Sequence, residues 1–78
     1  MEVNIMTLDE VSQQTGLSKR TVQLYEKEKL INPKKEENIK YYSKNDIQII
    51  EYINTLRNKG FTLNEIKKII NVKYANIV

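Results

Sequence analysis

Three polar side chains lie close together at the start of one predicted helix. Lys19, Arg20 and Gln23 follow a turn at Gly16, within the first turns of a short cationic segment. An α-helix fits the DNA major groove, where arginine can pair with guanine and glutamine with adenine. We therefore take all three as candidate base contacts, with Lys19 also within reach of a phosphate. The alternative is that they are ordinary solvated surface residues.

The helices that would position these side chains can be read from their capping signals. In a capping box, a Ser or Thr side chain covers a free backbone N–H, and an acid three residues later reaches back. Gly16 and Gly60 are the only glycines, and each sits where a helix should stop in a left-handed turn. Pro33 forbids continuation of the second helix, which we expect to end just before it. The predicted N-caps are Thr7, Ser18, Ser43 and Thr62.

Apolar residues recur at helical spacing in all four predicted helices. This spacing is the pattern expected of amphipathic helices that pack on one small core, and we assign these residues no other role. The predicted core residues are Leu8, Val11, Leu17, Val22, Ile47, Ile49, Ile50, Ile53, Leu56, Leu63, Ile66, Ile69 and Ile70, with Leu24 and Tyr25 on neighbouring faces of the second helix.

Residues 33–42 do not have a helical pattern and are predicted to form a two-stranded ribbon, or wing. Its tip should lie near Glu36 to Asn38, since Asn tolerates the positive φ of a tight turn. Tyr41 and Tyr42 should face opposite ways, as neighbours in a strand do. The lysines of this segment could bind phosphates or simply keep an exposed edge strand soluble. They are Lys34, Lys35 and Lys40.

Composition narrows the classes of function. The chain has 78 residues and a net charge of +3, and residues 17–44 alone carry eight bases and four acids. A localised basic patch is typical of nucleic-acid binders, although a solvated lysine-rich surface has the same composition. Without Cys or His, disulfides and the usual zinc sites are excluded. We expect no cofactor, no membrane span and no enzyme activity, because no catalytic cluster or phosphate-binding loop occurs.

Three ordered motifs in this sequence closely resemble the DNA-binding domain of the MerR family of bacterial transcription regulators. The motifs are Thr21-Val22-Gln23-Leu24-Tyr25-Glu26, Asn38-Ile39-Lys40-Tyr41-Tyr42-Ser43 and Gly60-Phe61-Thr62-Leu63-Asn64-Glu65-Ile66. The resemblance implies a mainly α fold, a winged helix-turn-helix with four helices and a short two-stranded β wing between the second and third helices. Residues 1–5 would be a lead-in, 6–71 the DNA-binding domain and 72–78 a tail.

The sequence departs from the family pattern at several of these positions. Gln23 stands where members usually have Arg, and Lys29 where they often have Gly. The resemblance also implies phosphate contacts from hydroxyls beside the groove, with Tyr42 near the start of the third helix. The full set of expected phosphate contacts is Ser18, Thr21, Tyr25, Lys34, Lys35, Lys40 and Tyr42.

The first functional hypothesis is sequence-specific binding of double-stranded DNA as a MerR-like, cytoplasmic transcription regulator, with RNA polymerase as a further partner. Members typically continue into a long dimerising helix, so the chain is expected to be either a fragment or a small domain-only relative. The second hypothesis is an excisionase-like or architectural protein whose monomers repeat along DNA instead of forming a homodimer. The third is a protein-interaction module that has lost DNA binding.

Overall fold

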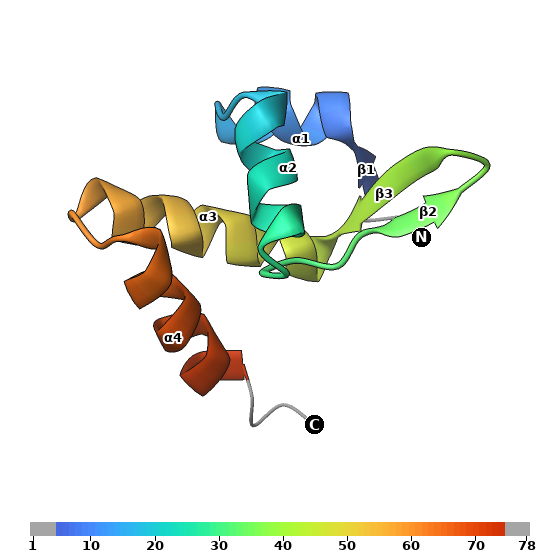
Figure 1. Ribbon diagram of the computed structural model, residues 1–78. Coiled ribbons are helices and arrows are strands. Elements are labelled where there is room, and N and C mark those ends of the chain that lie inside the picture. Colours follow the sequence, from blue (N-terminus) through green and yellow to red (C-terminus); the bar gives the residue numbers. More distant parts are fainter. Residues whose placement is uncertain (1–4, 75–78) are drawn as a thin grey trace.

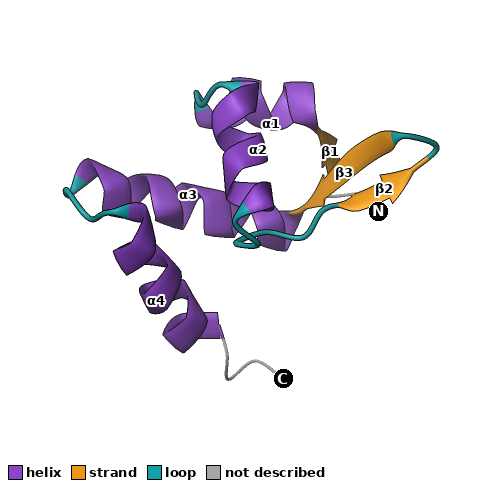
Figure 2. Cartoon of the chain, in the orientation of Figure 1, coloured by secondary structure: helices purple, strands orange, loops and turns teal. Residues whose placement is uncertain are grey.

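The computed structural model describes residues 5–74. Seven elements follow one another along the chain, and Figures 1 and 2 show their arrangement. The helix-turn-helix of α1 and α2 lies above the long α3, while the strands form a sheet that extends to one side. The elements are β1 (Ile5–Thr7), α1 (Leu8–Thr15), α2 (Lys19–Lys27), β2 (Lys34–Glu36), β3 (Ile39–Ser43), α3 (Lys44–Asn58) and α4 (Leu63–Tyr74). The predicted winged helix-turn-helix fold is confirmed.

Every helix starts at its predicted cap. The Thr7 N–H donates to Glu10 Oε1 at 2.9 Å, and the Glu10 N–H donates back to Thr7 Oγ1 at 3.4 Å. Equivalent reciprocal bonds join Ser43 to Asp46 and Thr62 to Glu65. These starts were predictable because each cap depends on only four consecutive residues.

The ends of α1 and α3 agree with the glycine prediction, whereas α2 ends earlier than the prediction from Pro33. Gly16 and Gly60 have φ of 76° and 99°. Helix α2 stops at Lys27, well before Pro33, because Lys29 itself takes the left-handed conformation with φ of 63°. The Leu30 N–H then donates to the Tyr25 carbonyl at 3.0 Å, and the Lys29 N–H to the Glu26 carbonyl at 2.9 Å. This is a Schellman ending, which needs a left-handed residue but not a proline.

The sheet has three antiparallel strands in the order β1-β3-β2, one more than the predicted ribbon. The predicted wing is the β2–β3 hairpin, in which Glu36 pairs with Ile39. Its two turn residues, Glu37 and Asn38, have φ of 49° and 69°, which is the two-residue turn that matches strand twist. The missed strand, β1, begins at Ile5 in the expected lead-in and pairs with the other edge of β3.

A single core joins the sheet and the helices. Val11 of α1, Val22 of α2, and Ile50 and Ile53 of α3 are fully buried, as the apolar spacing predicts. Ile66 of α4 completes this group, and Leu17 packs against the core from the α1–α2 turn. Helix α4 runs to Tyr74, so it continues into the segment expected to be a tail.

Asp46 is the one buried charged residue among those described, with 6% of its surface exposed. Its Oδ2 accepts from the Ser43 N–H at 3.0 Å, and its Oδ1 accepts from the Asn32 N–H at 3.3 Å. The carboxylate therefore caps α3 and also fastens the loop that leaves α2. In this way one side chain fixes the position at which the wing begins.

Candidate nucleic-acid interface

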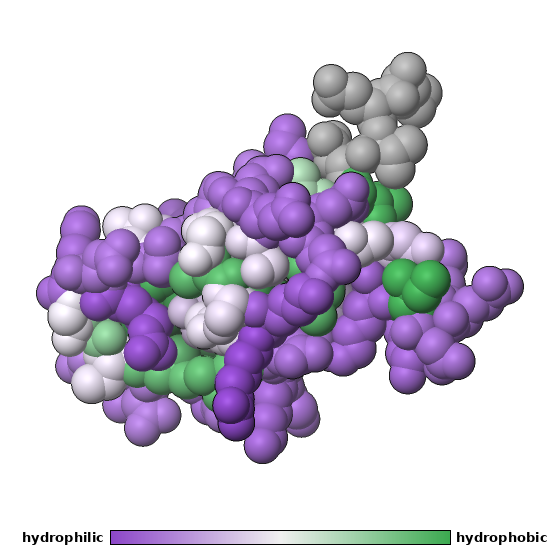
Figure 3. Space-filling view, turned by 90° about the horizontal axis from the view of Figure 1, so that it is seen from above, coloured by the Kyte–Doolittle hydropathy of each residue, from purple (hydrophilic) through white to green (hydrophobic). Residues whose placement is uncertain are grey.

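One face of α2 is buried and the other is open. Val22 and Tyr25 point into the core, whereas Lys19, Arg20 and Gln23 are exposed. The three candidate base-reading residues thus share the outer surface of one helix, as their spacing predicts. Seen from above (Figure 3), the molecule presents a mainly hydrophilic surface with separate apolar patches.

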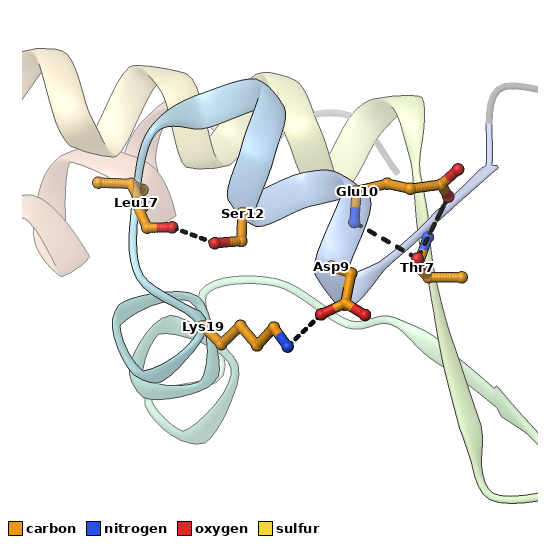
Figure 4. A network of polar contacts seen from close by, with 6 residues as sticks. All are labelled: Thr7, Asp9, Glu10, Ser12, Leu17 and Lys19. Carbon is orange, nitrogen blue, oxygen red and sulfur yellow. Dashed lines mark hydrogen bonds and ion pairs between the residues drawn. The ribbon is translucent and has the colours of Figure 1, made fainter.

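The turn between α1 and α2 is held by side-chain hydrogen bonds (Figure 4). Ser12 Oγ donates to the Leu17 carbonyl oxygen at 2.6 Å. At the start of α2, Ser18 Oγ accepts from the Thr21 N–H at 3.1 Å and lies 2.9 Å from Thr21 Oγ1. Ser18 and Thr21 therefore cap the helix in the free protein, with Ser18 still exposed beside the candidate base contacts.

Lys19 forms an ion pair with Asp9 of α1 (Figure 4). Both side chains are more than half exposed, at 57% and 67%, so water and salt screen the pair. An exposed pair of this kind contributes little to stability and can exchange for a phosphate. Lys19 thus remains available to contact DNA, although the Asp9 carboxylate lies next to it.

A groove lies between α2, the start of α1 and the wing. It encloses about 520 Å³ and brings Gln23 together with Lys35 and Lys40 from the wing. Lys34 is elsewhere, since it lines a separate hollow with Glu36 and Tyr41. Neighbouring residues of a strand face opposite ways, which explains why Lys34 and Lys35 lie on opposite faces of β2. The complete lining of the groove is Thr7, Leu8, Asp9, Gln23, Lys35, Asn38, Ile39 and Lys40.

Tyr25 and Tyr42, two of the expected phosphate contacts, are buried in the free protein. Tyr25 is only 1% exposed, and burial is the main reason that its pKa is raised. Tyr42 is fully buried, and its hydroxyl donates to Glu26 Oε1 at 3.2 Å. Burial first, and then the Glu26 carboxylate, raise the pKa of Tyr42 to about 12. In the free protein these tyrosines are therefore core residues, which argues against the expected phosphate contacts, and Tyr41 is the half-exposed member of its pair.

Lys40, another expected phosphate contact, is already paired with a carboxylate in the free protein. Its Nζ forms an ion pair with Glu26 Oε2, so one carboxylate of α2 holds both Lys40 and Tyr42 of β3. Sequence reasoning missed Glu26 and Asp9 as parts of this surface. The acids were visible in the sequence, but their partners lie far along the chain, so only the fold identifies the pairs.

The described residues offer no metal site, since no group of three or more His, Cys, Asp or Glu side chains within residues 5–74 could hold an ion. None of the helices in that range has the length and apolar character needed to cross a membrane.

Comparison with known proteins gives one consistent result. The family model described as "MerR HTH family regulatory protein" matches residues 6–73. The HTH-type transcriptional regulator AdhR of Bacillus subtilis is 37% identical over 60 residues, covering 74% of this chain and 43% of AdhR. The Heavy metal-dependent transcription regulator 2 of Rhizobium meliloti is 28% identical over 67 residues, covering 83% of this chain and 46% of that protein.

A solved structure has the same fold. It is the crystal structure of HiNmlR, described as a MerR family regulator lacking the sensor domain, bound to promoter DNA. The TM-score is 0.83 at 24% identity, and the match covers 92% of this chain and 56% of the other. The chain spans about half the length of the curated relatives that it matches.

Proposed function

Because the chain belongs to the MerR family of helix-turn-helix regulatory proteins, we propose that it binds double-stranded DNA as the reading module of a transcription regulator. The observation that carries this proposal is the open face of α2, where Lys19, Arg20 and Gln23 are all exposed. A helix-turn-helix presents this part of its second helix to base edges in the major groove. Catalysis has no part in the proposal.

The proposal divides the surface into two kinds of contact. Arg20 and Gln23 read bases, because their forked side chains can make paired hydrogen bonds. Lys19 and Lys35 hold phosphates, and Ser18 and Thr21 add hydroxyls at the helix start. Phosphate contacts supply affinity without sequence information, whereas base contacts supply the discrimination.

A regulator needs more than this module. One domain reads a single half-site, so specificity on a chromosome calls for a second copy on the DNA. A homodimer and RNA polymerase are accordingly part of the proposed function, and its setting is the bacterial cytoplasm. Footprinting decides the arrangement: an inverted repeat supports a dimeric regulator, and tandem repeats support the architectural alternative.

The test begins with selection of bound sequences from a pool of random duplexes. Arg20→Lys, which keeps the charge but loses the fork, should weaken binding to the selected duplex by about 1–3 kcal/mol and leave random-duplex binding nearly unchanged. Lys35→Gln should weaken both alike and reduce the log–log salt slope by about 0.9. Lys27→Gln, at the far end of the same helix, is the control and should alter neither contact set.

Equal losses on both duplexes for Arg20→Lys would remove Arg20 from base reading. Selection that enriches no sequence would reject specific DNA binding altogether. The absence of any salt-dependent duplex binding would favour the protein-interaction module.

A further inference from the structure

The carboxylate of Glu26 joins the two elements that the proposed function brings to DNA. Its Oε1 accepts from the Tyr42 hydroxyl at 3.2 Å, and its Oε2 pairs with Lys40 Nζ. Glu26 belongs to the last turn of α2, while Lys40 and Tyr42 belong to β3. Both oxygens are therefore engaged by the wing, at sequence separations of 14 and 16 residues.

This link is much better shielded than the Asp9–Lys19 pair, and its carboxylate is somewhat less exposed than the Glu28 carboxylate, which is 32% exposed in its pair with Lys67. The Glu26 side chain is 22% exposed and that of Lys40 is 37% exposed, compared with 67% and 57% for Asp9 and Lys19. Tyr42 is completely buried and comes from the central strand of the sheet. A partly buried ion pair whose carboxylate also accepts a hydrogen bond from a buried tyrosine is held in one geometry, whereas an exposed pair is free to rearrange.

Moving Lys40 to a phosphate would leave this carboxylate without its cation. The half-buried Glu26 carboxylate would then face the phosphates of the duplex beside the groove, which carry the same sign of charge. An unpaired charge in such a position is costly, so the exchange that is easy for Lys19 is unfavourable for Lys40.

We propose that Glu26 is a positioning residue that fixes the wing relative to α2, and that Lys40 serves as its strut rather than as a phosphate contact. This inference rests on the proposed DNA binding. The link determines where Lys35 meets the backbone when Gln23 and Arg20 meet the bases. It should therefore affect sequence discrimination more than gross affinity.

The decisive variant is Glu26→Gln, which still offers an acceptor to Tyr42 but releases Lys40. The matched control is Glu28→Gln, at the same end of α2. Glu28 pairs with Lys67 of α4 at 2.9 Å, on the side away from the groove. Both substitutions change net charge by one, so their difference isolates the wing link.

Affinity for the selected and random duplexes is measured over a range of salt. Relative to Glu28→Gln, Glu26→Gln should steepen the log–log salt slope by about 0.9, because the freed Lys40 gains a phosphate. The ratio of selected to random affinity should fall about fivefold or more, the loss of one well-made base contact. If Lys40 already binds a phosphate in the complex, the slope will match that of the control and the proposal is wrong.

Two further variants separate charge from geometry. Glu26→Gln combined with Lys40→Gln restores the net charge, so the slope should return to the wild-type value while the affinity ratio stays low. Recovery of the ratio would reduce the effect to charge and overturn the positioning role. Lys40→Arg keeps a cation for Glu26 and should retain the wild-type ratio.

A titration of the free protein tests the link without DNA. Since the Glu26 carboxylate contributes to the raised pKa of Tyr42, Glu26→Gln should lower the pKa of Tyr42 from about 12, while burial keeps it above 10.0. An unchanged titration by ultraviolet absorbance would show that the contact is absent. If the wild-type protein binds no duplex, the proposed function fails, whereas the titration still reports on the link.

Discussion

Replacing Asp46 by alanine removes one carboxylate that serves two separate parts of the chain. Its two oxygens accept from the N–H groups of Ser43 and Asn32, in a position where the residue is only 6% exposed. The Ser43 Oγ bond to the backbone N–H of residue 46 survives the substitution, because that N–H belongs to the main chain. The change therefore deletes the returning half of a capping box together with the fastening of the loop.

The magnitude follows from these two losses. The capping contribution is about 1 kcal/mol, and a hydrogen bond from an N–H to a charged acceptor is worth about 1.5–3 kcal/mol. Asp46→Ala should thus lower the free energy of unfolding by about 2.5–4 kcal/mol. At about 0.05–0.15 kcal/mol per residue, a chain of 78 residues has about 4–12 kcal/mol in all, so the loss is a large share.

Glu10→Ala provides a matched comparison. Glu10 closes the equivalent box at Thr7, but it is exposed and fastens no distant segment. This variant should lose only about 1 kcal/mol. Asp46→Asn, which keeps the shape and one acceptor oxygen, should fall between the two. Urea unfolding followed by far-ultraviolet circular dichroism measures all three, with the midpoint shifting at constant slope.

A stability loss for Asp46→Ala no larger than that for Glu10→Ala would contradict the second role of the Asp46 carboxylate. That result would mean that the Asn32 contact adds nothing and that the loop is held by other packing.

Three shorter predictions concern other parts of the chain. Lys29→Gly should stabilise the protein by up to about 1 kcal/mol in urea unfolding, because a left-handed φ of 63° strains any residue with a Cβ; a lower midpoint would contradict this. The Thr62 N–H and then its hydroxyl hold the pKa of Glu65 below its ordinary 4.5, so its stabilisation is present above that pH and is lost as pH falls through the lower folded-state value. Glu65→Gln should accordingly lose less stability on acidification than the wild type, as urea midpoints at neutral and acid pH will show. Tyr25→Phe should leave duplex affinity and its salt slope unchanged, and a marked fall in either would return Tyr25 to the phosphate contacts.

Features that depend on a few consecutive residues were predictable from the sequence. The helix starts at Thr7 and Ser43 belong here, as do the glycine endings and the wing turn at Asn38. Apolar spacing also identified the buried side of α3, since a helix repeats its faces every three to four residues. The exposed face of α2 follows from the same periodicity, which is why its three polar residues were placed correctly on the surface.

Features that depend on distant partners were not predictable in this way. The three residues of β1 are too few to show a strand pattern in the sequence, and they form a strand only because they pair with β3. Glu26 looks like any surface acid until the fold brings Lys40 and Tyr42 to it. The early end of α2 was missed for a different, local reason: Lys29 takes a left-handed conformation that sequence patterns assign to glycine.

The pairing of β1 with β3 also has a kinetic consequence. Ile5 lies opposite Ser43, so the whole helix-turn-helix is an excursion of the chain between two neighbouring strands. Bringing the two strands together costs the chain entropy of the long segment between them before any contacts of the sheet can form. Such non-local pairings are slow steps in folding. We expect α1 and α2 to gain their helical structure early, from local capping, and to reach their final orientation only when the two distant strands meet.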